Sequence, residues 1–541
     1  MKAVLLALLL ALAPPLAQAN DLQAARAATD ARRFDEALRL FEQLLSTRPA
    51  DSDLLIETAR VYGFADRHRE AVATYRRVLD VAPVRRHDVL PSLAWQTLWA
   101  GDAATARVLF AEARDAAGPN QRLRAELLQG EGEAAEALGD VNGALAAYRQ
   151  ALDLQPGDAG VQRRLARTLN AAGRHAAAAT LYARADDGRD AGVRLDHARA
   201  RRWSGDEAGA HALLAGRNDP AAVWLREWRL ARDLKTSVSA SVEHATDRDD
   251  LDATALQLSA GRWFTPPLHG EVAVRQLRLD EPSGDADVQR VSGRLTARFG
   301  AIDETRGLWI ASLALSAQSA EGWHPVSGSA SLRWLPADGW RFGAELGREL
   351  IETPTAIANR ISVDVAALSA EHRLTPRWTV AGSIARLDFS DHNTRTRFNG
   401  RAGYLVRSHS PRLEAGVEAM AFESSRPASF APVLPPGTRA PVGYWNPRRY
   451  VEGRAYLTLE GEAQPLEWQL KLAAGSAREV DGDGNRSSAQ PHQIEAALAY
   501  DLSPALRLRL AAGASGAGFG VNAGGSGYWR RYVGVTLSGW F

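Results

Sequence analysis

The feature that most constrains the fold is a two-residue alternation of apolar and polar side chains that runs from Ser237 to Phe541. Successive side chains of a β-strand point to opposite faces, so a period of two predicts strands. Each alternating stretch reaches the roughly 9–11 residues that a tilted strand needs to cross a membrane. The predicted strands are 237–246, 253–263, 271–280, 287–299, 307–317, 326–335, 339–350, 360–373, 377–389, 393–406, 412–423, 448–461, 466–478, 491–501, 505–516 and 527–541.

The connections between these sixteen strands alternate in length. Short turns, most of them with Pro, follow the even-numbered strands, whereas longer polar segments follow the odd-numbered ones. Short turns on one rim and long loops on the other are typical of a transmembrane barrel, whose short turns face the periplasm. The sequence therefore predicts a 16-stranded antiparallel transmembrane β-barrel over residues 236–541.

Tryptophans lie close to the predicted short turns. Indole rings prefer the level at which lipid chains meet headgroups, so a ring of Trp at one rim is typical of an aromatic girdle. The residues expected to form it are Trp263, Trp309, Trp334, Trp340, Trp378 and Trp468.

Polar and charged residues occupy the alternate positions, which should face the inside of the barrel. They carry both signs of charge, so they do not identify the charge of a substrate. An equally good interpretation is that these charges pair with one another and fill a closed barrel. The residues predicted to line the lumen are Arg290, Arg294, Arg341, Glu345, Asp364, Arg395, Arg397, Arg401, Glu414, Glu418, Glu452, Arg454, Tyr456, Glu467, Lys471, Glu495, Arg507, Arg509, Arg530 and Tyr532.

The last stretch, Gly527–Phe541, is an alternating strand that ends on an aromatic residue. We expect it to pair with Ser237–Thr246 and close the barrel. Phe541 would then lie at the periplasmic rim, where it serves as an assembly signal.

The first half of the chain has a different period, of about 34 residues, with a small residue followed four positions later by an aromatic one. This pattern resembles the tetratricopeptide repeat, in which paired helices stack into a superhelix. It predicts an α-solenoid of about six helix pairs over residues 20–233, with a generic Ala-rich helical bundle as the alternative. The repeat-packing residues are Ala37, Phe41, Ala71, Tyr75, Ala106, Phe110, Ala144, Tyr148, Ala178 and Tyr182.

Pro220–Asp233 is the last helical stretch before the strands. We expect it to cap the array where the barrel begins, although its Trp and Leu residues would also suit an amphipathic helix on the membrane. Residues 1–19 have the charged, apolar and small-residue parts of a secretory signal peptide, with a short membrane anchor as the alternative.

Composition excludes several classes of function. The chain has no Cys, which rules out disulfides and thiolate metal sites, and its net charge of +1 gives no argument for nucleic-acid binding. Ser369 and His372 fall on opposite faces of one strand, so they make a poor catalytic pair. Residues 481–485 (DGDGN) suggest a calcium loop, but His492 stands where the bidentate Glu would be, which favours an extracellular turn. We expect no enzymatic activity, no metal and no cofactor.

A leader, a helical array and a C-terminal barrel together resemble the outer-membrane exopolysaccharide exporters, which include the poly-N-acetylglucosamine export porin and the cellulose-secretion component. Phe389–Arg395 (FSDHNTR) and Gly443–Tyr450 (GYWNPRRY) look like short segments of these barrels. The resemblance implies an outer-membrane pore for a linear polysaccharide, with the array in the periplasm bound to polysaccharide-modifying or synthase-complex proteins. About six repeats are fewer than such exporters usually carry, so a non-conducting receptor or assembly scaffold is the alternative. Residues 424–446 form a loop long enough to fold into the lumen.

Overall fold

The computed structural model describes residues 21–541, apart from residues 266, 283, 303–306, 428–442 and 517–527. The predicted signal peptide and most of the 424–446 loop lie outside the described residues. The chain divides into two compact units, one with the described residues up to Ala172 and Leu181–Asp187, and the other with Gly173–Thr180 and Gly188–Phe541. The last helices before the strands therefore group with the barrel, whereas the sequence placed the boundary between 233 and 236.

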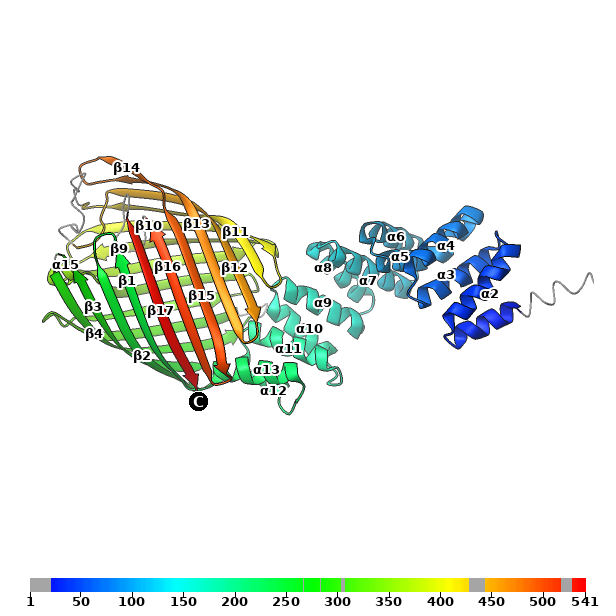
Figure 1. Ribbon diagram of the computed structural model, residues 1–541, viewed down its shortest axis with the longest axis horizontal. Coiled ribbons are helices and arrows are strands. Elements are labelled where there is room, and N and C mark those ends of the chain that lie inside the picture. The colour runs from blue at the N-terminus through cyan, green and yellow to red at the C-terminus, as the bar shows by residue number, and fades with distance from the viewer. Residues whose placement is uncertain (1–20, 266, 283, 303–306, 428–442, 517–527) are drawn as a thin grey trace, which may run out of the picture. The chain divides into compact units, whose positions relative to one another are not determined.

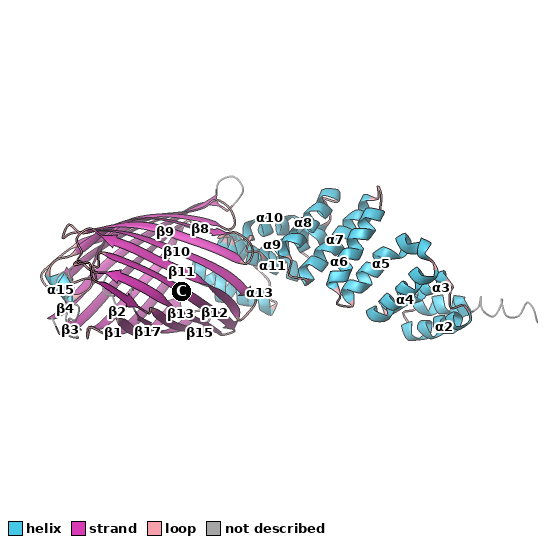
Figure 2. Ribbon diagram, turned by 90° about the horizontal axis from the view of Figure 1, so that it is seen from above, coloured by secondary structure: helices cyan, strands magenta, loops and turns pink. Residues whose placement is uncertain are grey.

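Residues 21–234 are helical throughout, as the colours of Figure 2 show. No helix in the described part of the chain is long and apolar enough to span a membrane. A first helical segment at 21–30 is followed by α2 (Phe34–Thr47), α3 (Ser52–Phe64), α4 (His68–Val81), η1 (Pro83–Arg85), α5 (Arg86–Trp99), α6 (Ala103–Ala116), α7 (Gln121–Ala137), α8 (Val141–Leu154), α9 (Ala159–Ala171), α10 (His175–Ala185), α11 (Ala191–Trp203), α12 (Glu207–Leu213), α13 (Pro220–Trp224), η2 (Leu225–Leu230) and α14 (Ala231–Leu234).

The repeated aromatic positions form the core of the array. Phe110 and Tyr148 are both fully buried. Phe110 lies on α6 and Tyr148 on α8, and both rings pack against α7. A Cβ atom added at Gly130 would lie 2.3 Å from the Phe110 ring, and one added at Gly132 would lie 2.5 Å from the Tyr148 ring. Glycine at these two positions is therefore what lets successive helix pairs approach closely.

Side-chain caps and sharp turns set the helix boundaries. Asp102, Asp140 and Asp158 each accept backbone N–H groups of the helix that follows, which satisfies donors that the first turn leaves free. The turns before α6 and α8 pass through Gly101 and Gly139, whose positive φ angles suit glycine. The helix-turn-helix units thus end where the sequence repeat ends.

The second half forms one antiparallel sheet that closes on itself, because β1 pairs with both β2 and β17 (Figure 1). This confirms the predicted 16-stranded barrel. A short additional strand, β14, pairs with the end of β13 in a segment expected to be a loop. The strands are β1 (Ser237–Asp247), β2 (Asp252–Thr265), β3 (Leu268–Glu281), β4 (Gly284–Ala301), β5 (Gly307–Ala320), β6 (Val326–Leu335), β7 (Trp340–Leu350), β8 (Ser362–Arg373), β9 (Trp378–Phe389), β10 (Thr394–Arg407), β11 (Arg412–Ser424), β12 (Arg449–Ala463), β13 (Leu466–Val480), β14 (Arg486–Ala489), β15 (His492–Ser503), β16 (Leu506–Gly516) and β17 (Trp529–Trp540).

The closing strand β17 runs along the whole of β1, from Ser237 opposite Trp540 to Asp247 opposite Arg530. Beyond its end, the backbone N–H of Phe541 donates to the carbonyl of Thr236 at 2.9 Å. Each of the sixteen long strands, as far as the structure describes them, thus has a partner on both sides, which a sheet surrounded by lipid requires.

The outer surface of the barrel is apolar and exposed. Leu258, Leu315 and Leu368 each have more than half of their surface exposed, and a solvent of lipid tails accounts for this arrangement. Trp309 and Trp334 stack on this face with ring centroids 5.3 Å apart. Trp263 differs from the expected girdle, because the register places it on the inner face, where the guanidinium of Arg298 lies 5.0 Å from its ring.

The helix formed by α13, η2 and α14 binds the rim at which β17 ends. The guanidinium of Arg232 donates to the carboxylate of Asp501 and to the carbonyls of Ser503 and Pro504. It also lies 4.6 Å from the ring centroid of Trp540. The prediction that Pro220–Asp233 packs where the barrel begins is confirmed.

Candidate functional site

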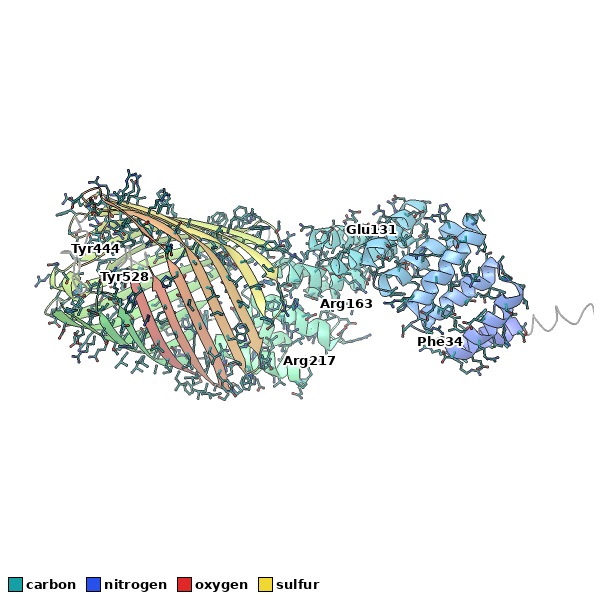
Figure 3. All side chains as sticks on the ribbon, turned by 45° about the horizontal axis from the view of Figure 1, so that its top comes forward. Phe34, Glu131, Arg163, Arg217, Tyr444 and Tyr528 are labelled. Carbon is teal, nitrogen blue, oxygen red and sulfur yellow. The ribbon has the colours of Figure 1, made fainter. Side chains whose placement is uncertain are left out.

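The inner face of the barrel contains every residue predicted to line the lumen except Asp364. The register makes the inward positions of neighbouring strands Cα partners, as in Arg290 opposite Gln318, Glu418 opposite Arg454, and Arg509 opposite Thr536. Figure 3 shows the side chains that project from these strands. The lumen is therefore lined by charged and hydrogen-bonding groups.

The assignment of Asp364 to the lumen is wrong. Asp364 lies opposite Arg348 on the outer face that also carries Leu346 and Leu368, and its carboxylate accepts two hydrogen bonds from the Arg348 guanidinium at 2.6 and 2.7 Å. At this end of β8 the apolar neighbour Val363 faces inward and is fully buried. The usual polarity is reversed here because the inner face contacts protein instead of water.

That protein is a plug inside the barrel, formed by residues 351–361 and 443–446. Residues 351–361 connect β7 to β8 and contain the short helix α15 (Pro354–Ala358). Ile357 packs against inward residues of β2 to β5, such as Leu277 and Val288. The long loop predicted to be able to enter the lumen thus contributes residues 443–446, and a second loop, which the sequence did not indicate, contributes the rest.

The plug also packs on other parts of the inner face. Tyr444 stacks on Phe389 of β9 with ring centroids 4.5 Å apart. Trp445 contacts Phe422 of β11 and Tyr450 of β12. Together with Ile357, these contacts cover the inner faces of β2 to β5, β8 to β9 and β11 to β13 at one end of the barrel.

Polar contacts join the two parts of the plug and hold them to the barrel. The Glu352 carboxylate forms ion pairs with Arg275 of β3 and Arg290 of β4 at 2.7 and 2.5 Å. The Thr353 hydroxyl donates to the carbonyl of Gly443 at 2.6 Å. Gly443 has a φ of 81°, and a Cβ there would lie 2.3 Å from the backbone N of Ala356, so only glycine fits.

The two short segments singled out in the sequence meet at the plug. The Asn393 amide donates to the Tyr444 hydroxyl at 3.1 Å and to the Asn446 side-chain oxygen at 3.0 Å. The Tyr444 hydroxyl in turn donates to Asp391 at 2.8 Å. Burial, together with this hydrogen bond to Asp391, raises the pKa of the Tyr444 phenol, so it stays protonated.

Arg395 lies on the inner face as expected, but it is only 2 % exposed and belongs to the plug's support. Its guanidinium donates to the Ser424 hydroxyl and to the Trp445 carbonyl, and it lies 4.3 Å from the Phe422 ring centroid. It is therefore not available to a molecule in the lumen. Sequence reasoning missed Glu352, Thr353 and Asn446, and the signal that could have found them is the apolar inward positions at the ends of β8 and β9.

A second group of inner-face charges is engaged in ion pairs across strands β10 to β13, and we call it the paired wall: Arg401, Glu414, Glu418, Arg454 and Lys471. Glu418 pairs with Arg454 at 2.7 Å and with Lys471 at 3.2 Å. Glu414 pairs with Arg401 and accepts a hydrogen bond from the Tyr456 hydroxyl at 2.8 Å. These ion pairs link the inner faces of β10 to β13.

A polar cavity of about 860 Å³ opens along the other side of the lumen. It lies between β1 and β15 to β17 on one side and β3 to β7 on the other. Tyr528, labelled in Figure 3, lines it and donates to Asp247 at 2.9 Å. The cavity is lined by, among others, Glu243, Arg290, Arg294, Glu349, Glu352, Glu495, Arg509, Arg530 and Tyr532.

The cavity offers hydrogen-bond donors and acceptors in similar measure. Among the described residues, no group of three His, Asp or Glu side chains could hold a metal ion. In the 481–485 turn, the Asp481 carboxylate accepts backbone N–H groups of Asp483 and Asn485 at 2.9 and 2.8 Å. Ser369 faces inward and His372 outward, where it stacks on Trp340.

A closed barrel with an apolar outer surface and a polar lumen makes this chain an outer-membrane protein of a Gram-negative bacterium. The repeat array suits the binding of other proteins.

Comparisons with known proteins match parts of the chain. Residues 28–89 and 125–158 each match a tetratricopeptide-repeat family model. No curated protein matches the sequence significantly. Among solved structures, the chain is similar to a bacterial polysaccharide outer membrane secretin at 13 % identity, with 57 % of this chain and 99 % of that one covered and a TM-score of 0.45. It is also similar to the type IV pilus biogenesis factor PilW (18 % identity, 37 % and 91 % covered, TM-score 0.33) and to a TPR protein of Thermus thermophilus (25 % identity, 34 % and 98 % covered, TM-score 0.26).

Proposed function

We propose that this protein is a gated outer-membrane conduit through which a linear exopolysaccharide leaves the cell. The observation that carries the proposal is the polar cavity beside the plug, because a sugar chain moves by exchanging weak hydrogen bonds with a wall of mixed donors and acceptors. The cavity volume falls within the roughly 300–1,000 Å³ that small-ligand sites occupy.

The helical array would lie in the periplasm and guide the polymer or bind polysaccharide-modifying or synthase-complex proteins. The concave surface of a repeat array is commonly used in this way. The proposal assigns the protein no enzymatic step, so the driving force for export would come from polymer synthesis.

The plug gives the conduit a closed state. Besides its apolar contacts, the plug is held to the barrel by the ion pairs of Glu352 with Arg275 and Arg290. Removing the Glu352 carboxylate would leave the two guanidinium groups without a counter-charge, which weakens the contact between plug and barrel. We expect export to require displacement of residues 351–361 toward the outside.

The same plug favours a second candidate function, a non-conducting receptor or scaffold that uses its repeats to bind proteins. In that case the plug would be a permanent part of the barrel interior. The two functions differ in whether the plug can leave.

Single-channel recording of the full-length protein in planar bilayers separates them. We expect Glu352→Gln to raise the open probability several-fold over the wild type. Asp364→Asn is the matched control, since it removes one carboxylate from an Arg pair on the outer face and should leave conductance unchanged. Silence of the wild type and of Glu352→Gln under all voltages would favour the scaffold.

A further inference from the structure

The charged residues of the lumen differ in whether they are already engaged. In the paired wall, each carboxylate of β11 binds two partners, as Glu418 does with Arg454 and Lys471. Lys471 is the Cα partner of Glu495, yet its ammonium group binds Glu418 instead. Among the residues that the structure describes, Glu495 thus has no ion pair, although Lys471 lies opposite it on the neighbouring strand.

Glu495 belongs to a second group, which we call the free wall: Glu243 of β1, Glu495 of β15, Arg509 of β16, and Arg530 and Tyr532 of β17. In the part of the chain that the structure describes, none of its four charged residues forms an ion pair. Glu495 accepts one hydrogen bond, from Gln493 at 2.7 Å. All five line the polar cavity.

The free wall faces charges of two kinds across the cavity, since Arg275 and Arg290 are paired with Glu352 whereas others are not. Arg294 of β4 and Glu349 of β7 line the same cavity and, within the described residues, have no ion pair. Unpaired guanidinium and carboxylate groups keep their hydrogen-bonding capacity for whatever enters. Closer to the rim of the same strands, Arg507 pairs with Asp501 and Glu467, so on β16 the unpaired guanidinium is that of Arg509, which lines the cavity.

The plug supports the same division of the lumen. Its apolar contacts reach β2 to β5 through Ile357, β8 to β9 through Tyr444, and β11 to β13 through Trp445. Within the described residues, these apolar plug contacts do not include β1 or β15 to β17. The free wall therefore lies on the side of the lumen that these plug contacts leave uncovered, and a polymer can pass the plug along it.

The balance of charge on the two sides of the cavity restricts the ligand. Carboxylates and guanidiniums both line it, with Glu243 and Glu349 among the first and Arg294 and Arg530 among the second. A polyanion would meet the carboxylates and a polycation would meet the guanidiniums, at a cost in each case. An uncharged sugar chain can donate to the first and accept from the second, and it can lie on the ring of Tyr532.

We infer that the free wall is the polymer-binding surface of the conduit and that the polymer it binds is an uncharged glycan. This inference rests on the proposed function. It assigns the paired wall to barrel structure and the free wall to substrate contact.

Isothermal titration of the full-length protein in detergent micelles tests the assignment, with an uncharged cello-oligosaccharide pentamer as the probe. We expect the double variant Glu495→Gln/Arg509→Gln to lose at least about tenfold in affinity, which corresponds to about 1.4 kcal/mol. The matched control is Glu418→Gln/Lys471→Gln, which removes one charge of each sign from the paired wall and should keep the affinity within about twofold. Heat-modifiable mobility on gels verifies that both variants fold.

Each other outcome overturns the inference. Equal losses in the two double variants would remove the distinction between the walls. Tighter binding of a galacturonate pentamer or of a glucosamine pentamer would replace the uncharged class by an anionic or a cationic one, and leave the export function standing. Failure of all three pentamers to bind the wild type would exclude the free wall as a glycan site, and the bilayer recordings would then decide separately whether the protein conducts.

Discussion

The helical array and the barrel place their large apolar residues in opposite positions. Phe110 in the array is fully buried, whereas Leu368 in the barrel is 61 % exposed. Each arrangement matches its surroundings, because water drives apolar side chains inward and lipid accepts them on the outside. Exposed apolar residues therefore indicate the solvent of a region, and they do not indicate poor packing.

The comparison predicts that the array depends on side-chain burial and the barrel on its hydrogen-bonded backbone. The array core is built from aromatic rings against glycine and alanine. The barrel instead has a continuous ladder in which each of its sixteen long strands pairs on both sides. Loss of a buried ring should thus destabilise the array most, whereas the barrel should be most sensitive to a charge placed on its lipid-facing surface.

The largest effect is expected for Phe110→Ala, which should reduce the free energy of unfolding of the array by about 3–5 kcal/mol through loss of burial and creation of a cavity. Denaturant unfolding followed by helical circular dichroism measures it, and the barrel should remain folded by gel mobility. Phe64→Ala is the control, since this ring is 61 % exposed and should cost less than about 1 kcal/mol. Equal losses at the two positions would contradict the burial argument.

A charge on the outer face should have the next largest effect. Leu368→Arg places a guanidinium in the middle of β8 toward lipid, and should destabilise the barrel by about 2–4 kcal/mol. Folding into lipid vesicles as a function of urea measures this. Ser369→Arg, one residue later on the inner face, should be tolerated because it reaches the lumen. If the two variants behaved alike, the assignment of the faces would be wrong.

The stability of the helices at the barrel rim should depend on pH through His175. Burial, with smaller contributions from Arg373 and Arg341, lowers the pKa of His175 to about 4. The unfolded chain takes up this proton first, so the stabilising contribution is complete above pH 6.5 and is lost as the pH falls toward 4, at about 1.4 kcal/mol per pH unit. The difference in stability between the wild type and His175→Gln across this range isolates the effect, and a difference that does not vary with pH would refute it.

Deletion of Phe541 should have the smallest thermodynamic effect, since it removes one backbone hydrogen bond of about 1 kcal/mol to Thr236. Its consequence should appear in assembly, as a lower yield of inserted barrel with an intact array. Trypsin resistance of the membrane fraction measures the yield. Normal insertion of the truncated chain would exclude Phe541 as an assembly signal.

The strands could be predicted because lipid imposes a simple rule on every one of them. An inward position and an outward position alternate without exception along β16, where Arg507 and Arg509 oppose Leu506 and Leu508. The rule failed where protein replaces water inside the barrel. Asp364 was assigned to the wrong face because its inward neighbours contact the plug. Trp263 was assigned to the girdle because it lies near a short turn, although its side chain is on the inner face of the strand.

The plug could not be predicted because its contacts join residues far apart in the chain. Glu352 meets Arg275 across 77 positions, and no local pattern encodes such a pair. The segments around Asn393 and Tyr444 were singled out one at a time, but only the structure shows that they bind each other. The signal peptide and the exact domain boundaries remain predictions.

The contact between Arg232 and the closing strand has a mechanical consequence. Under the proposed function, a polymer moving through the lumen would pull on the strands, and the seam between β17 and β1 is where the last strand of the sheet meets the first. Arg232 lies over the ring of Trp540 and donates hydrogen bonds to the turn before β16, so it connects both to the helix that leads into β1. The end of β17 is thereby tied to the helix that leads into β1, so a side-chain contact supports the seam in addition to its backbone hydrogen bonds.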